Sequence, residues 1–124
     1  MFTSIEEQTT ILSDHTLRIL HELYFGAHRL GYRQLLFLIP HYALDNSQSL
    51  TKELYPRAAR HFGYSSWQPI ERTVRIAILN AWSQRDHEIW SKYFSRIVTT
   101  PTNKQFIATI AEEIKKPLPV KGEA

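Results

Sequence analysis

Residues 65–82 have the sequence SSWQPIERTVRIAILNAW. Apolar residues recur in this stretch at helical spacing, namely Ile70, Val74, Ala77, Ile78 and Ala81. Polar residues fall on the opposite side of the same helix, namely Gln68, Glu71, Arg72 and Arg75. The pattern predicts a helix over residues 68–83, with one face buried in a core and an outer face available to a partner.

A second helix is predicted just before this one, over residues 50–62. The small and polar run from Gly63 to Ser66 separates the two helices. Two helices, a tight connection and arginines near the start of the second helix are typical of a helix-turn-helix. Any helical bundle also contains consecutive amphipathic helices joined by short turns, so the pattern alone leaves both interpretations open.

The rest of the chain is also predicted to be helical, over residues 14–24, 30–43, 86–94 and 102–116. Ser13 or Asp14 can cap the first of these helices, and a capping box begins at Thr102. Pro40 is expected to kink or shorten its helix, because it lacks a backbone donor. No alternating strand pattern is present. The predicted fold is therefore all-α, with about six helices and an embedded helix-turn-helix, winged-helix-like but without strands.

A chain of 124 residues is one domain by length. We divide it into an N-terminal arm over residues 1–12, a helical domain over residues 13–116 and a disordered tail over residues 117–124. The absence of cysteine excludes disulfides and Cys-ligated metal sites. No signal peptide or bilayer-spanning segment is recognisable, so we expect a cytoplasmic protein without membrane contact.

The net charge of +3 is unevenly distributed along the chain. Residues 1–28 carry one basic and four acidic side chains, whereas residues 29–104 carry eleven basic and five acidic ones. Basic charge therefore gathers in the region of the predicted helix-turn-helix, where it would attract a polyanion. A merely solvated basic surface explains the same distribution.

The sequence offers no chemistry for catalysis. Its six histidines form no HExxH motif and no i,i+4 pair, and no Gly-rich phosphate loop is present. The tryptophans fit a core better than a surface that stacks bases, except Trp67, which lies in the predicted turn. We expect no enzyme, no metal and no cofactor.

Several short motifs, in this order, resemble a known family: Gly26 to Tyr32, Leu54-Tyr55-Pro56, Ile70-Glu71-Arg72 with Arg75, Ala81-Trp82-Ser83 and Pro101-Thr102-Asn103 with Phe106 to Ala108. The family is the C-terminal DNA-binding effector domain of the stage-zero sporulation master response regulator of Firmicutes. The resemblance implies sequence-specific binding of double-stranded DNA and regulation of transcription at sporulation initiation. Family members recognise an element resembling TGTCGAA.

The resemblance assigns base reading to Glu71, Arg72 and Arg75, because the family's Glu-Arg-x-x-Arg pattern matches these positions. Arginine binds guanine with two hydrogen bonds, and glutamate can accept one from cytosine. An ordinary surface ion pair between Glu71 and Arg75 is the alternative. The chain departs from the family at Pro69, Ile76 and Thr100, where the family has basic residues or histidine.

The predicted contacts to the DNA backbone are Lys52, Arg60, Ser65, Ser66, Gln68, Thr102, Asn103 and Lys104. Helix capping is an alternative role for Ser66 and Thr102. The partners that the resemblance implies are double-stranded DNA, an RNA polymerase sigma factor and a second copy of the chain on tandem sites. The family's regulator also has a receiver domain, which this sequence lacks. A helical protein-interaction module, or a competitor of a full-length regulator without specific DNA binding, is the alternative function.

Overall fold

A computed structural model describes residues 4–26 and 29–116. These residues form six α-helices and one π-helical segment and contain no strand, so the predicted all-α class is confirmed. The elements are α1 (Ile5–Glu22), α2 (Leu30–Leu44), η1 (Leu50–Leu54), α3 (Tyr55–Phe62), α4 (Gln68–Ser83), α5 (His87–Phe94) and α6 (Asn103–Ile114).

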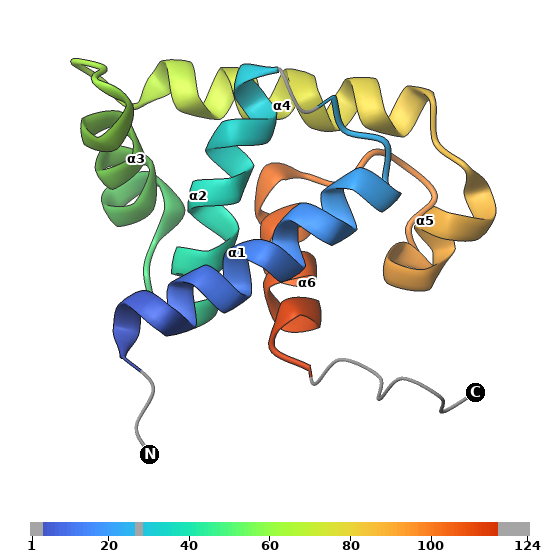
Figure 1. Cartoon of the computed structure of the whole chain (residues 1–124). Helices are drawn as coiled ribbons and strands as arrows, with labels where there is room; N and C mark the ends of the chain where they lie inside the picture. The colour runs from blue at the N-terminus through green and yellow to red at the C-terminus, as the bar shows by residue number, and fades with distance from the viewer. Residues whose placement is uncertain (1–3, 27–28, 117–124) are drawn as a thin grey trace.

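The helix α2 is the centre of the domain and packs against α1, α4 and α6. Figure 1 shows α4 lying across one end of the molecule, with α2 and α6 running away from it. The predicted apolar stripe of α4 faces this core, because Ile70, Val74 and Ile78 are completely buried. Burial of each such side chain contributes roughly 1.5–3 kcal/mol to folding. The opposite side of α4 is left on the surface.

The helix α1 starts earlier than the sequence predicted. It begins at Ile5, where the hydroxyl of Ser4 accepts a hydrogen bond from the Glu7 backbone N–H at 3.0 Å. Ser13 and Asp14 are therefore interior positions of α1 and not its caps. Residues 5–12 belong to the helix and do not form an arm. The predicted tail, residues 117–124, lies outside the described residues.

Two prolines lie within predicted helices, Pro40 in α2 and Pro56 in α3. Pro40 lies inside α2, and the helix continues past it to Leu44, so the predicted shortening is wrong. Pro56 lies in the first turn of α3, where a missing N–H costs little. Just before it the backbone widens into η1, in which Leu54 and Tyr55 donate to Ser49 and Leu50 in i→i−5 bonds. The predicted helix over residues 50–62 is thus two helical pieces.

A polar contact joins α1 to α5. The Glu22 carboxylate accepts hydrogen bonds from Lys92 Nζ at 2.8 Å and from the Tyr93 hydroxyl at 2.9 Å. The bond from Lys92 lowers the pKa of Glu22 from its ordinary value of 4.5, and the bond from Tyr93 acts in the same direction, against the opposing effect of burial.

Glu22→Gln is expected to lower the melting temperature by about 1–3 °C at neutral pH, because the lowered pKa means that the ionised carboxylate stabilises the fold. This contribution is present above the unfolded pKa and is lost as the pH falls through the lower folded pKa. Thermal unfolding of both proteins should therefore give melting temperatures that converge as the pH falls through the lowered folded pKa of Glu22. A difference that stays constant between neutral and acidic pH would contradict a role for the charge.

Candidate nucleic-acid interface

The turn between α3 and α4 is fixed by backbone geometry. Gly63 ends α3 in the left-handed region, with φ of 80°, and Tyr64 N–H donates to the Ala59 carbonyl at 2.8 Å. Only a residue without Cβ adopts this φ without strain. Ser65 and Ser66 follow on the surface of the turn. The turn therefore sets the angle at which α4 leaves α3.

The start of α4 does not use the predicted cap. Trp67 occupies the N-cap position, no side chain caps the helix, and Pro69 lies in the first turn. The capping role considered for Ser66 is therefore wrong. The ring of Trp67 stacks on Tyr55 with 5.8 Å between centroids, so Trp67 packs α3 against the start of α4.

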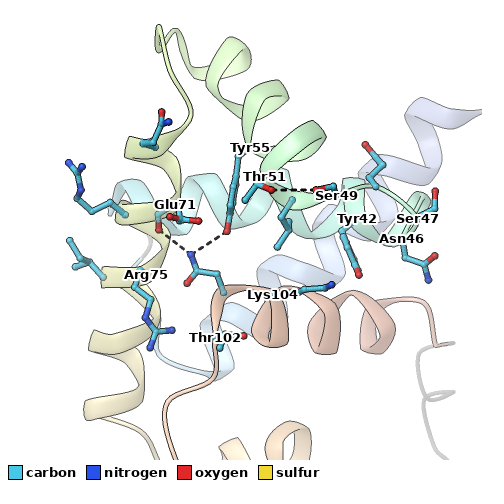
Figure 2. Close-up of a pocket in the computed structure, with 16 residues that line it drawn as sticks. Tyr42, Asn46, Ser47, Ser49, Thr51, Tyr55, Glu71, Arg75, Thr102 and Lys104 are labelled. Carbon is cyan, nitrogen blue, oxygen red and sulfur yellow. Dashed lines mark hydrogen bonds between the residues drawn. The ribbon is translucent and has the colours of Figure 1, made fainter.

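A groove of about 980 Å³ runs between the start of α4, the segment that leads into α3 and the start of α6. It brings together all three predicted base-reading residues and four of the predicted backbone contacts, namely Glu71, Arg72, Arg75, Gln68, Thr102, Asn103 and Lys104. Figure 2 shows Glu71 and Arg75 on α4, and Thr102 and Lys104 at the start of α6; all four residues line the groove. The groove is lined by three basic side chains and one acidic one.

The other predicted backbone contacts do not line this groove. Lys52 lies in η1 and Arg60 in α3, and both side chains are exposed, as are Ser65 and Ser66 in the turn. Arg60, Ser65 and Ser66 lie on the surface of the helix-turn-helix, and Lys52 lies just before it. These residues can meet only a partner that extends beyond the groove, as a duplex would.

The two arginines of α4 differ in their environment. Arg72 is exposed, and within the described part of the chain its side chain has no hydrogen bond or ion pair. Arg75 is half-buried and donates from Nη1 to the Pro101 carbonyl at 2.5 Å. The alternative ion pair between Glu71 and Arg75 is not formed. One guanidinium is thus free for a partner, and the other also positions the segment before α6.

Asn103 connects α6 to the helix-turn-helix. Its side-chain nitrogen donates to the Tyr55 hydroxyl at 3.3 Å and to the Glu71 carbonyl at 3.1 Å (Figure 2). Burial raises the pKa of Tyr55, so its hydroxyl stays neutral and available as acceptor. An amide nitrogen has two donors, and both are used here. Asn103 therefore positions α4 relative to α6.

Asn103→Ala is expected to lower the free energy of unfolding by about 1–3 kcal/mol, because the hydroxyl of the buried Tyr55 and the Glu71 carbonyl each lose a partner. Urea unfolding followed by circular dichroism measures the change. Lys104→Ala is a matched control on the next residue, since Lys104 is exposed and should change stability by less than about 0.5 kcal/mol. Equal effects of the two substitutions would show that Asn103 does not support the fold.

The first turn of α6 is closed by the predicted capping box. Gln105 N–H donates to the Thr102 hydroxyl at 3.0 Å, and Thr102 N–H donates to Gln105 Oε1 at 2.8 Å. The capping role considered for Thr102 is therefore confirmed. Lys104 lies exposed in this turn and adds a positive charge where the helix dipole already favours an anion.

Sequence reasoning missed much of the groove's other side. The residues that complete the lining come from the end of α2, the following loop, η1, α3 and α4, namely Tyr42, Asn46, Ser47, Gln48, Ser49, Leu50, Thr51, Tyr55 and Ile76. The polar run around Asn46 predicted a loop, but no local sequence pattern predicted that this loop lines the same groove as α4. Ile76 had one available signal, since it interrupts the polar face of the helix.

Residues 16–114 match the family model described as Sporulation initiation factor Spo0A C terminal. The match covers the whole of the helix-turn-helix and of α6. In the described ranges no three histidine, aspartate or glutamate residues are grouped to hold a metal ion. No helix found there is long and apolar enough to cross a bilayer.

Proposed function

Because the chain belongs to the family of Spo0A C-terminal domains, which are DNA-binding effector domains of sporulation initiation and not enzymes, we propose that it binds specific sequences in double-stranded DNA and regulates transcription. The observation that carries the proposal is the exposed Arg72, beside Glu71 and Arg75 on the first turns of α4. In a helix-turn-helix these turns of the second helix meet base edges in the major groove.

The three residues would act differently on the bases. Arg72 has its whole guanidinium available and would bind O6 and N7 of a guanine with two hydrogen bonds. Arg75 keeps other N–H groups besides the one that Pro101 accepts, so it would read a base while anchored. Glu71 would accept from a cytosine amino group. This mixture of charges favours a base sequence over DNA in general.

The phosphate contacts would come from two sides of α4. Lys104, Thr102 and the amides of the first turn of α6 would hold one strand. Gln68 in the groove, with Ser65 and Ser66 in the turn outside it, would hold the next phosphates. Lys52 and Arg60 would add charge further out. Asn103 would contribute indirectly, by fixing the distance between the two sides.

The proposed partners besides DNA are a second copy of the chain and an RNA polymerase sigma factor, and the proposed place of action is the cytoplasm. Tandem elements would bind two copies of the chain, and an RNA polymerase sigma factor would be the protein partner in the cytoplasm. On the same sites, the chain would compete with a full-length regulator.

Fluorescence anisotropy tests the proposal with a duplex that contains an element resembling TGTCGAA and with a scrambled duplex of equal composition. We expect tighter binding to the element, and a loss of affinity greater than about tenfold between roughly 50 and 200 mM salt. Equal affinity for both duplexes, together with equal affinity for all members of a random duplex pool, would overturn the proposal. That outcome would favour a protein-interaction module.

A further inference from the structure

The outer face of α4 carries two exposed aliphatic side chains, although the helix also buries a full apolar stripe. Ile76 is 52% exposed and Leu79 is 42% exposed. Neither contributes fully to the core that Val74 and Ile78 form. Isolated exposed apolar residues are common on proteins and need no explanation. The position of Ile76 makes it different, because it lines the groove together with Arg72 and Arg75.

Ile76 lies one helical turn beyond Arg72. Four residues advance about 6 Å along a helix, and successive bases on one strand are about 3.4 Å apart. A helix that lies along the major groove with Arg72 on a guanine therefore brings Ile76 close to the edge of a base about two steps away. Leu79 is a further turn along α4 and does not line the groove.

We propose that Ile76 is a specificity-determining residue that contacts the 5-methyl group of a thymine about two base pairs from the guanine bound by Arg72; this inference rests on the proposed function. An isoleucine side chain has neither donor nor acceptor, and the thymine methyl is the apolar group that the major groove presents. Placing Ile76 over the amino group of cytosine or adenine would remove that group from water without a hydrogen bond.

The surroundings of Ile76 favour DNA over a protein as the occupant. Arg72 and Arg75 precede it on the same helix, and Lys104 lines the same groove from α6. An apolar protein surface would leave these cations without partners, whereas a duplex supplies phosphates and guanine acceptors to them. The aliphatic side chain then adds selectivity inside a site whose attraction is electrostatic.

Replacing single thymines by deoxyuridine tests the inference, because this substitution removes only the methyl group. The probe is the duplex that the wild-type protein binds best from a random pool. Deoxyuridine at one thymine is expected to weaken wild-type binding about fourfold, the ratio that corresponds to the roughly 0.8 kcal/mol of one buried methyl-sized group. Ile76→Ala should bind the thymine duplex about fourfold more weakly and should not distinguish it from the deoxyuridine duplex.

Leu79→Ala is the matched control, since it removes an exposed aliphatic side chain of the same helix outside the groove. It should keep the sensitivity of the wild type to deoxyuridine. The inference is overturned if no thymine methyl matters to the wild type, or if Ile76→Ala remains as sensitive as the wild type. If the protein binds one duplex selectively but no deoxyuridine substitution weakens binding, only the inference about Ile76 is wrong. If no duplex is selected from the pool, the proposed function is wrong as well.

Discussion

Gly31→Ala is expected to lower the free energy of unfolding by about 1–3 kcal/mol, an unusually large loss for the addition of one methyl group. Gly31 is buried in the first turn of α2, where α4 crosses it. A Cβ atom at this position would lie 2.5 Å from the Cβ of Ala77 and 2.9 Å from the Thr73 carbonyl oxygen. The second contact is with backbone, so α4 itself would have to move away from α2.

Urea unfolding of Gly31→Ala measures this loss, and Gly26→Ala is its control. A Cβ at Gly26 would come no closer than 3.3 Å to another atom, and its nearest neighbours belong to the flexible side chain of Arg29. We expect a change of less than about 1 kcal/mol there. Similar losses for the two variants would show that the α2–α4 crossing is not as close as described.

The double variant Gly31→Ala, Ala77→Gly separates the crowding from other effects of the substitution. Removing the Ala77 methyl eliminates the closest contact, so the two changes should be less destabilising together than the sum of their separate effects. Recovery should be partial, since the Thr73 carbonyl oxygen remains 2.9 Å away. Additive losses would contradict a direct contact between the two residues.

The sequence predicted α4 to the residue, because its apolar stripe is strong and Pro69 is tolerated in its first turn. The observed bounds, Gln68–Ser83, are those of the prediction. The start of α1 was missed because its first turns are solvent-exposed and have no apolar stripe. A signal was nevertheless present, since Ser4 and Glu7 have the spacing of a capping box, and the Ser4 hydroxyl does accept from Glu7 N–H.

The groove could be predicted only in part, because its two walls are distant in sequence. The residues of α4 and the start of α6 were both identified, through helical periodicity and resemblance. The contact between Asn103 and the Glu71 carbonyl, however, joins positions 32 residues apart, and no local pattern encodes it. The same holds for the bond from Arg75 to the Pro101 carbonyl. Tertiary packing thus gave Asn103 and Arg75 structural contacts that the sequence did not indicate.

Arg72→Ala is expected to weaken binding to the preferred duplex by about 5- to 160-fold, which corresponds to the roughly 1–3 kcal/mol of an arginine that binds guanine with two hydrogen bonds. Binding to a scrambled duplex should weaken far less, because only the loss of one charge acts there. Arg33→Ala is the matched control on the surface of α2, since Arg33 is exposed and does not line the groove. An equal loss of affinity on both duplexes would reduce Arg72 to a phosphate contact.

Comparing the stability and DNA affinity of Arg72→Ala with those of Arg75→Ala distinguishes a residue that only contacts bases from one that also stabilises the fold. Arg72 has no bond within the described residues, so its removal should change the free energy of unfolding by less than about 0.5 kcal/mol. Arg75→Ala removes the bond to the Pro101 carbonyl and should cost about 0.5–1.5 kcal/mol of stability besides affinity. If both variants are as stable as the wild type, the bond to Pro101 does not hold the segment before α6. Selectivity that survives in Arg72→Ala but is lost in Arg75→Ala would transfer the main base contact to the anchored arginine.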